Sequence, residues 1–152
     1  MEFYPAVLDR AASDAMARRI HSLLAERGWG LWAAELRATG EFIGYIGLQV
    51  PVATLPFSPC VEIGWRLAKE FWGRGLATEG AKGALRVGFA ELGLEEIVSF
   101  TAVINRRSRA VMERLGMLED KDAAFDHPSV TEGRLRAHCL YRLSRERWAA
   151  TL

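Results

Sequence analysis

The sequence has few cysteines, no excess of charge of either sign and no long hydrophobic run. Its two cysteines, Cys60 and Cys139, are too few for a disulfide framework, which favours a reducing cytoplasm. The 20 basic and 19 acidic side chains give a net charge of +1, so nothing favours nucleic acid or a membrane surface as a partner. The longest apolar runs, such as 42–50, fall short of the roughly 20 residues that a membrane-spanning helix needs. The first residues do not have the pattern of a secretory signal.

What remains is the composition of a folded soluble protein. Half of the 152 residues are hydrophobic and 26% are charged. No internal repeat, low-complexity tract or linker divides the chain. We therefore expect one globular domain over residues 1–152.

Periodicity and turn residues predict an alternation of helices and strands. The expected helices are 9–27, 74–92, 106–115 and 145–150. The expected strands are 31–37, 42–50, 61–67, 97–103 and 137–143. The acidic stretch 119–132 is expected to be a surface loop.

The segment 61–103 has the order strand, helix, strand, which is typical of a βαβ unit with two parallel strands. Hairpin strands precede it and another strand follows, so we expect a mixed α/β sheet flanked by helices. Ligands of such sheets bind beyond the carboxyl ends of the parallel strands, beside the helix N-termini. A site is therefore expected near 67–78 and 103–108.

A glycine-rich turn, Trp72-Gly73-Arg74-Gly75, lies at the first of these places. Glycine lets the backbone approach a ligand, and the first amides of a helix have no helical partners, so the turn could bind a phosphate or pyrophosphate. An ordinary glycine turn is the alternative. The dinucleotide fingerprint fits poorly because Thr78 stands where its third small residue belongs, and no Walker motif follows the glycines.

A second motif, Asn105-Arg106-Arg107-Ser108, opens the helix expected at 106–115. Asn105 suits a helix N-cap, and the arginines suit a solvated helix face. The motif nevertheless lies at the mouth of the same expected cleft as the glycine turn.

Taken in order, these motifs resemble the GNAT superfamily of N-acetyltransferases. The resemblance rests on Val-Glu-Ile-Gly-Trp at 61–65, Trp-Gly-Arg-Gly-Leu-Ala-Thr-Glu at 72–79, Asn105-x-x-Ser108 and Leu-Gly-Met at 115–117, and it covers about residues 5–148. The branch it looks closest to is the RimJ/RimL type, which acetylates protein N-termini or small amines.

The resemblance implies a GNAT-like fold and a set of contacts to acetyl-CoA. The glycine turn would bind the pyrophosphate, the pantetheine arm would lie between two splayed parallel strands, and the acetyl group would pass to the amine without an acyl-enzyme. The cofactor-binding residues it implies are Trp65, Arg66, Leu67, Trp72, Gly73, Arg74, Gly75, Leu76, Ala77, Thr78, Asn105 and Ser108.

The chain departs from the family pattern in two places. The wider superfamily starts the turn with Gln or Arg where this chain has Trp72, although the RimJ/RimL branch tolerates Trp. Family members also begin with a strand and a helix for which this sequence has no residues. Three explanations are open. The start of the sequence is placed too late, the chain is truncated, or a partner subunit, such as a second copy in a homodimer, covers the exposed edge and the acceptor pocket.

Acetyl transfer to an amine needs a base, an oxyanion donor and a proton for the leaving thiol. Glu62 is the candidate base, because burial in an apolar strand would raise its pKa; a structural ion pair is the alternative. By the resemblance Ser108 lies near the thiol and could protonate it. A backbone amide within 65–67 is the expected oxyanion donor, and Tyr141 is a candidate to reach the cleft.

These observations lead to an acetyl-CoA-dependent N-acetyltransferase acting on a primary amine, with catalytically silent CoA binding as the alternative. The three histidines have no metal-ligand spacing, so no metal is expected. A nucleotide-binding domain is a third hypothesis, which Thr78 disfavours. No nucleic acid or membrane partner is expected.

Overall fold

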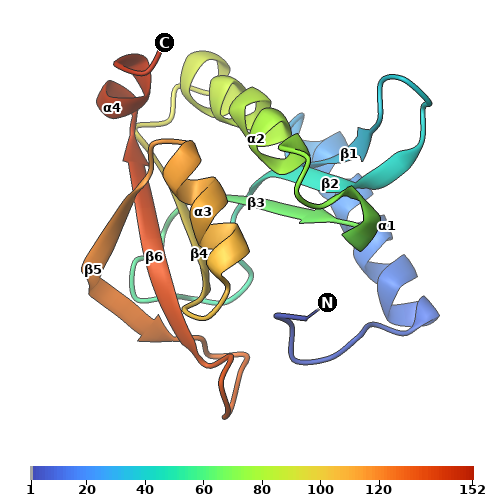
Figure 1. The fold of residues 1–152 in the computed structure, drawn as a ribbon, viewed down its shortest axis with the longest axis horizontal. Helices are drawn as coiled ribbons and strands as arrows, with labels where there is room; N and C mark the ends of the chain where they lie inside the picture. Colours follow the sequence, from blue (N-terminus) through green and yellow to red (C-terminus); the bar gives the residue numbers. More distant parts are fainter. Residues whose placement is uncertain (1) are drawn as a thin grey trace.

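The computed structural model describes residues 2–152, and its centre is a six-stranded mixed sheet (Figure 1). The strands lie side by side in the order β1-β2-β3-β4-β6-β5. All neighbours are antiparallel except β3 and β4, which are parallel. The strands are β1 (Leu31–Glu35), β2 (Phe42–Gln49), β3 (Glu62–Leu67), β4 (Glu96–Ala102), β5 (Leu118–Asp126) and β6 (Ala137–Ser144). The predicted mixed α/β sheet is confirmed.

Four α-helices flank this sheet, with α2 and α3 in front of it and α1 behind it in the view of Figure 1. They are α1 (Arg10–Arg27), α2 (Leu76–Arg86), α3 (Arg106–Arg114) and α4 (Arg145–Ala149), and a π-helical turn, Val87–Glu91, continues α2. The helix α2 begins two residues later than predicted. Gly73 and Gly75 have φ angles of 73° and 76°, which lie outside the helical region and hold the chain in a turn.

The predicted surface loop at 119–132 is wrong over its first half, because residues 118–126 form the edge strand β5. Its charged side chains suggest a loop in the sequence, but charge is common on edge strands, where it discourages further pairing. Within the sheet Asp120 accepts a hydrogen bond from Arg142 Nε on β6 at 2.8 Å. This cross-strand partner cannot be identified until the strand register is known.

The two parallel strands, β3 and β4, separate almost as soon as they meet. They share one residue pair, Glu62 opposite Val98, and Val98 N donates to Val61 O at 3.0 Å. One residue further on, the Ser99 hydroxyl donates to Ile63 O at 2.9 Å. In a strand the N–H and C=O of one residue point to the same side, and every second residue repeats that direction. Because Ile63 O faces β4, the backbone of Trp65, two residues further on, also faces the gap. The sheet is therefore open toward the carboxyl ends of these strands.

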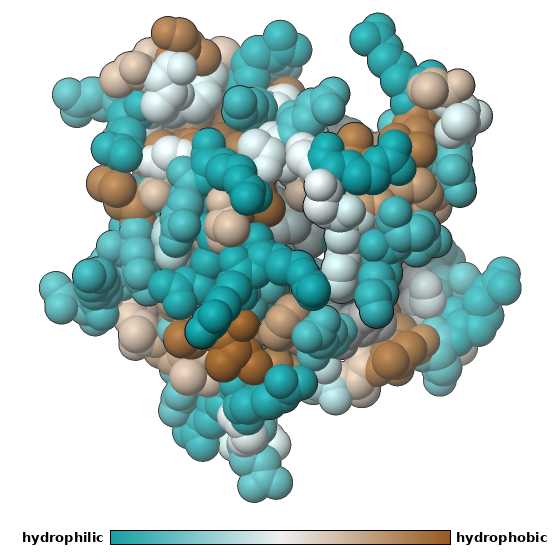
Figure 2. Space-filling view, in the orientation of Figure 1, coloured by the Kyte–Doolittle hydropathy of each residue, from teal (hydrophilic) through white to brown (hydrophobic). Residues whose placement is uncertain are grey.

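The hydrophobic core lies between the sheet and α2, where Leu48, Ile63, Leu85 and Ile97 are fully or almost fully buried. No helix within residues 2–152 is both long and apolar enough to cross a membrane. Figure 2 shows hydrophilic side chains over most of the face in view, with apolar residues in small separate areas.

Gly47 and Gly64 pair across β2 and β3 but differ in how closely other backbone approaches them. A Cβ on Gly47 would collide with the backbone of Gly30 and Leu31, whereas a Cβ on Gly64 would meet no atom within 4 Å. We expect Gly47→Ala to lower the free energy of unfolding by about 1–3 kcal/mol. The matched Gly64→Ala should change it by less than about 0.5 kcal/mol. Urea unfolding followed by circular dichroism measures both, and equal losses would contradict the close approach.

Candidate active site

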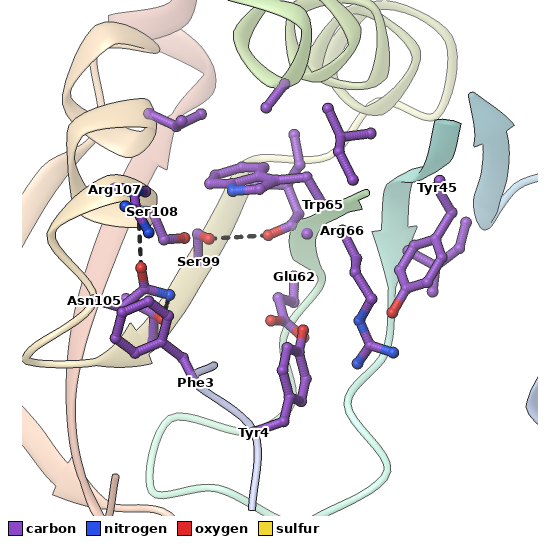
Figure 3. A pocket seen from close by; sticks show the side chains of 18 of the residues that line it. Phe3, Tyr4, Tyr45, Glu62, Trp65, Arg66, Ser99, Asn105, Arg107 and Ser108 are labelled. Atoms are coloured by element: carbon purple, nitrogen blue, oxygen red, sulfur yellow. Dashed lines mark hydrogen bonds between the residues drawn. The ribbon is translucent and has the colours of Figure 1, made fainter. Parts of the chain in front are cut away.

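A cleft of about 2090 Å³ opens where β3 and β4 diverge. Its walls come from β3, β4, the turn before α2, the first turn of α3, one side of α1 and residues 2–5. Figure 3 shows side chains from β3, β4, α3 and the first segment around this space. Segments far apart in the sequence therefore face one another across a single space.

All but one of the residues predicted to bind acetyl-CoA or to act in catalysis line this cleft. Those that do are Glu62, Trp65, Arg66, Leu67, Trp72, Gly73, Gly75, Leu76, Ala77, Thr78, Asn105 and Ser108. Arg74 is not among the lining residues, and its guanidinium carbon lies 5.8 Å from the centre of the Phe71 ring. The two sequence motifs, 72–78 and 105–108, thus meet across one cleft.

The turn before α2 presents backbone N–H groups that have no helical partner. The first helical bond runs from Glu79 N to Gly75 O at 3.0 Å, so the amides of Leu76, Ala77 and Thr78 lie before it. Among the described residues no side chain caps this helix end. Such amides, at the positive end of a helix dipole, favour an anionic group.

The indole of Trp72, where the wider superfamily has Gln or Arg, ties the glycine turn to the sheet. Its Nε1 donates to Leu67 O at 2.8 Å, which fixes the turn to the carboxyl end of β3. The guanidinium of Arg107 lies over the same indole, 4.9 Å from the ring centre, a cation–π distance. Trp72 therefore has a structural role of its own, which is to hold the glycine turn against β3.

Basic side chains line the cleft from the turn after β3 and from α2 and α3. They are Lys69, Lys82, Arg106, Arg107 and Arg114. A chain whose net charge is only +1 therefore has a local region of positive potential, which attracts anionic ligands.

Asn105 is the N-cap of α3, as one interpretation of the sequence predicted. Its Oδ1 accepts a hydrogen bond from Ser108 N at 3.2 Å, and its Nδ2 donates to Thr101 Oγ1 at 3.0 Å. These bonds orient the side chain and begin the helix at the cleft wall, which also places Ser108 there.

Glu62 is buried, at 8% exposure, at the point where β3 and β4 separate. Burial raises the pKa of its carboxyl group from 4.5 to about 7, and a 2.9 Å hydrogen bond from Gln49 Nε2 opposes part of that rise. Within residues 2–152 no cationic group forms an ion pair with Glu62. The expected rise in pKa is thus present, and the alternative of a structural ion pair is not. Gln49 was missed because only the register of β2 against β3 places it opposite Glu62.

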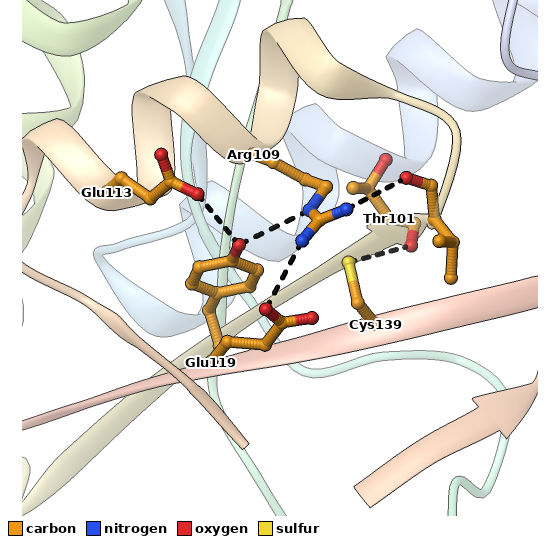
Figure 4. Close-up of polar contacts among 7 residues, drawn as sticks. Thr101, Arg109, Glu113, Glu119 and Cys139 are labelled. Carbon is orange, nitrogen blue, oxygen red and sulfur yellow. Dashed lines mark hydrogen bonds and ion pairs between the residues drawn. The ribbon is translucent and has the colours of Figure 1, made fainter. Parts of the chain in front are cut away.

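The expectation that Tyr141 reaches the cleft is wrong. Its side chain is 1% exposed, its hydroxyl donates to Glu113 Oε1 at 3.0 Å, and it accepts a hydrogen bond from Arg109 Nε at 3.3 Å (Figure 4). Arg109 also pairs with Glu119 at 3.2 Å. Tyr141 lies on the side of β6 that α3 covers, so it supports that helix and does not line the site.

Two histidines, His127 and His138, lie together on the cleft wall. The rings of His127 and His138 are 4.9 Å apart, beside Phe100, and burial lowers the pKa of both imidazoles. They meet because β5 ends just before His127 and β6 begins just before His138. In the described part of the chain no three His, Cys, Asp or Glu side chains form a group that could hold a metal ion.

The chain matches a known protein family. The family model described as the acetyltransferase (GNAT) domain matches residues 1–118. The chain is also 39% identical, over 129 residues, to the FsC-acetyl coenzyme A-N(2)-transacetylase of Aspergillus fumigatus, which covers 80% of this chain and 52% of that protein. The chain spans about half the length of the curated relatives that it matches.

Solved structures show the same fold. An acetyltransferase from Agrobacterium tumefaciens superposes with a TM-score of 0.68 at 29% identity, over 90% of this chain and 72% of that one. The ribosomal-protein-S5-alanine acetyltransferase from Vibrio fischeri gives a TM-score of 0.74 at 17% identity, over 95% of this chain and 80% of that one. At that identity the likeness is one of fold.

The buried carboxyl group of Glu62 should make stability depend on pH. A raised pKa means that the folded protein holds this proton more tightly than the unfolded chain, so the stabilisation is complete below pH 4.5 and is lost as the pH rises to about 7. We expect Glu62→Gln to gain stability over the wild type across that interval, by roughly 3 kcal/mol. Urea unfolding at a series of pH values measures the difference, and Glu41→Gln, at an exposed position, is the control. A difference that does not change with pH would refute the assignment.

Proposed function

This chain belongs to the GNAT acetyltransferase family, and we propose that it transfers an acetyl group from acetyl-CoA directly to a primary amine. One observation carries the proposal: the divergence of β3 and β4 brings open backbone, unpartnered helix amides and a buried carboxyl group into one cleft. The acceptor amine would belong to a protein N-terminus or to a small molecule.

The two ends of the cleft suit different parts of acetyl-CoA. We assign its phosphates to the amides of residues 76–78 and to the glycine turn, where the basic side chains gather. We assign the pantetheine arm to the gap beside Trp65, whose backbone N–H and C=O face it, and to Asn105. The backbone of Arg66 faces β2, where it pairs with Tyr45, so only its side chain is available to a ligand. When bound, acetyl-CoA supplies a thioester that an amine can attack.

The chemistry follows from the groups around the gap. The Glu62 carboxylate takes a proton from the ammonium group of the acceptor, directly or through a water molecule, since a pKa of about 7 lets it do so near neutral pH. The N–H of Trp65 or Leu67 donates to the oxyanion that forms as the amine attacks. As the C–S bond breaks, the Ser108 hydroxyl donates a proton to the departing thiolate and receives in turn the proton that the acylated nitrogen loses, so that the hydroxyl is restored.

We propose that the enzyme is of the RimJ/RimL type. We also propose that it is cytoplasmic, which the free thiols of Cys60 and Cys139 support. The Aspergillus fumigatus relative, named as an N(2)-transacetylase that uses an acetyl coenzyme A, supports an amine acceptor. We also propose a homodimer, because within residues 2–152 β1 pairs with β2 alone and leaves one backbone edge open. Light scattering of the purified chain measures that association.

Acetyl-CoA binding tests the cleft assignment, with Gly75→Ala as the diagnostic variant. Gly75 and Gly28 have nearly the same φ, 76° and 77°, and a Cβ on either meets no atom within 4 Å. Both alanine variants should lose roughly 1 kcal/mol of stability to backbone strain. Only Gly75→Ala should weaken acetyl-CoA binding, by about tenfold. Calorimetry with acetyl-CoA, and with NADH and ATP as controls, measures this; NADH or ATP binding tighter than acetyl-CoA would reject the proposal.

Turnover tests the base. We expect Glu62→Gln to lower kcat by roughly 10²- to 10⁴-fold, because the proton of the acceptor ammonium loses its acceptor, while acetyl-CoA affinity stays near that of the wild type. The wild-type rate should rise with pH and level off above about 7. The release of CoA thiol with a panel of amines measures both, and Glu41→Gln is the matched control. Binding of acetyl-CoA with no thiol release for any amine would favour a silent CoA-binding module instead.

A further inference from the structure

Arg66 carries a positive charge in the cleft for which residues 2–152 supply no charged partner. Within the described residues its guanidinium forms no ion pair, and its Nε is buried without a hydrogen-bond acceptor. Buried polar atoms in folded proteins are nearly always hydrogen-bonded, and the Nε of the half-buried Arg66 is an exception. An unsatisfied donor on a residue that lines this cleft therefore points to a ligand.

Two tyrosine rings position this guanidinium. Its carbon lies 4.0 Å from the centre of the Tyr4 ring and 5.4 Å from that of Tyr45 (Figure 3). Contacts with aromatic faces hold the cation but do not use the N–H donors that lie in the guanidinium plane. Those donors have the fork geometry that binds a carboxylate through two hydrogen bonds.

Glu62 does not neutralise Arg66, although both lie on the same face of β3. Burial and the Gln49 hydrogen bond account for the pKa of Glu62, with no contribution from Arg66. Burial is also the main cause of the raised pKa of Tyr45; the nearby Tyr4 and Glu62 raise that pKa further, and Arg66 lowers it in part. Tyr45 therefore keeps its hydroxyl proton and remains a hydrogen-bond donor beside Arg66.

We propose that Arg66 binds a carboxylate of the acceptor, so that the acceptor is a small amine that also carries a carboxylate, as amino acids do. This inference rests on the proposed acetyltransferase function. In Figure 3 the Arg66 side chain runs back along β3, toward the end of the strand where Glu62 lies. A compact acceptor can therefore present its amine to Glu62 and its carboxylate to Arg66. A polyamine would place a second ammonium group against Arg66, which like charge disfavours.

The experiment compares acceptors that differ in one group. Free amino acids, their amides and diamines of similar length are assayed by thiol release at saturating acetyl-CoA. We expect the wild type to prefer each amino acid to its amide by about tenfold or more, the effect of one charge-assisted hydrogen bond. Arg66→Gln should lower kcat/KM for amino acids by about ten- to a hundredfold and leave the amides nearly unchanged. Arg66→Lys should keep part of the preference, because it retains the charge without the fork. Arg18→Gln, at an exposed position of α1 outside the cleft, is the matched control.

A second measurement does not depend on catalysis. Calorimetry with an N-acetylated amino acid and with its amide, in the presence of CoA, should show a preference for the carboxylate that Arg66→Gln removes. Equal turnover or binding of carboxylates and amides by the wild type, or a preference that survives in Arg66→Gln, would overturn the inference and leave the acetyltransferase proposal standing. Failure of every amine to release thiol would count against the proposed function, and the binding measurement would still decide the role of Arg66.

Discussion

The site depends on how little β3 and β4 touch. A single parallel pair, Glu62 opposite Val98, joins the two halves of the sheet, and the hydroxyl of Ser99 then bonds to Ile63 O. Beyond that point the backbone N–H and C=O of Trp65 face the gap, where the described residues place no strand beside them. The same divergence explains the chemistry of Glu62, which lies where the strands are last in contact and is buried there. The open backbone and the raised pKa thus have one structural cause.

Such a fork is stable because each arm has its own support. β3 is paired along its whole length with β2, and β4 with β6, so the gap between the arms breaks few hydrogen bonds. The α3 side is held from behind, where Arg109 joins Tyr141 to Glu119. The turn before α2 is held by the indole of Trp72. The groups that face the gap are therefore carried by packed elements, which fixes their relative positions.

Local patterns predicted the parts of this site that local forces build. The glycines of the turn, the N-cap Asn105 and the strand–helix–strand order each act within a few residues, so sequence spacing alone located them. The edge strand β5, the Gln49 bond to Glu62 and the burial of Tyr141 each depend on a partner from another strand. Their positions follow from register, which one sequence does not contain. Arg66 lay within the predicted cofactor strand, but its unpaired side chain became visible only when its neighbours were known.

The distribution of charge in the cleft constrains what Glu62 and Arg66 can do together. A cation close to Glu62 would lower its pKa and weaken it as a base, so a carboxylate-binding arginine in the same cleft has to stay out of direct contact. The structure meets this condition, because Arg66 lies four residues further along β3 and is held by tyrosine rings. The other basic side chains that line the cleft lie in the turn after β3 and on α2 and α3. A net charge of +1 thus conceals a group of basic side chains around the glycine turn and a separate arginine held by two tyrosine rings, an arrangement in which an anionic cofactor and a carboxylate-bearing amine would each have its own partner.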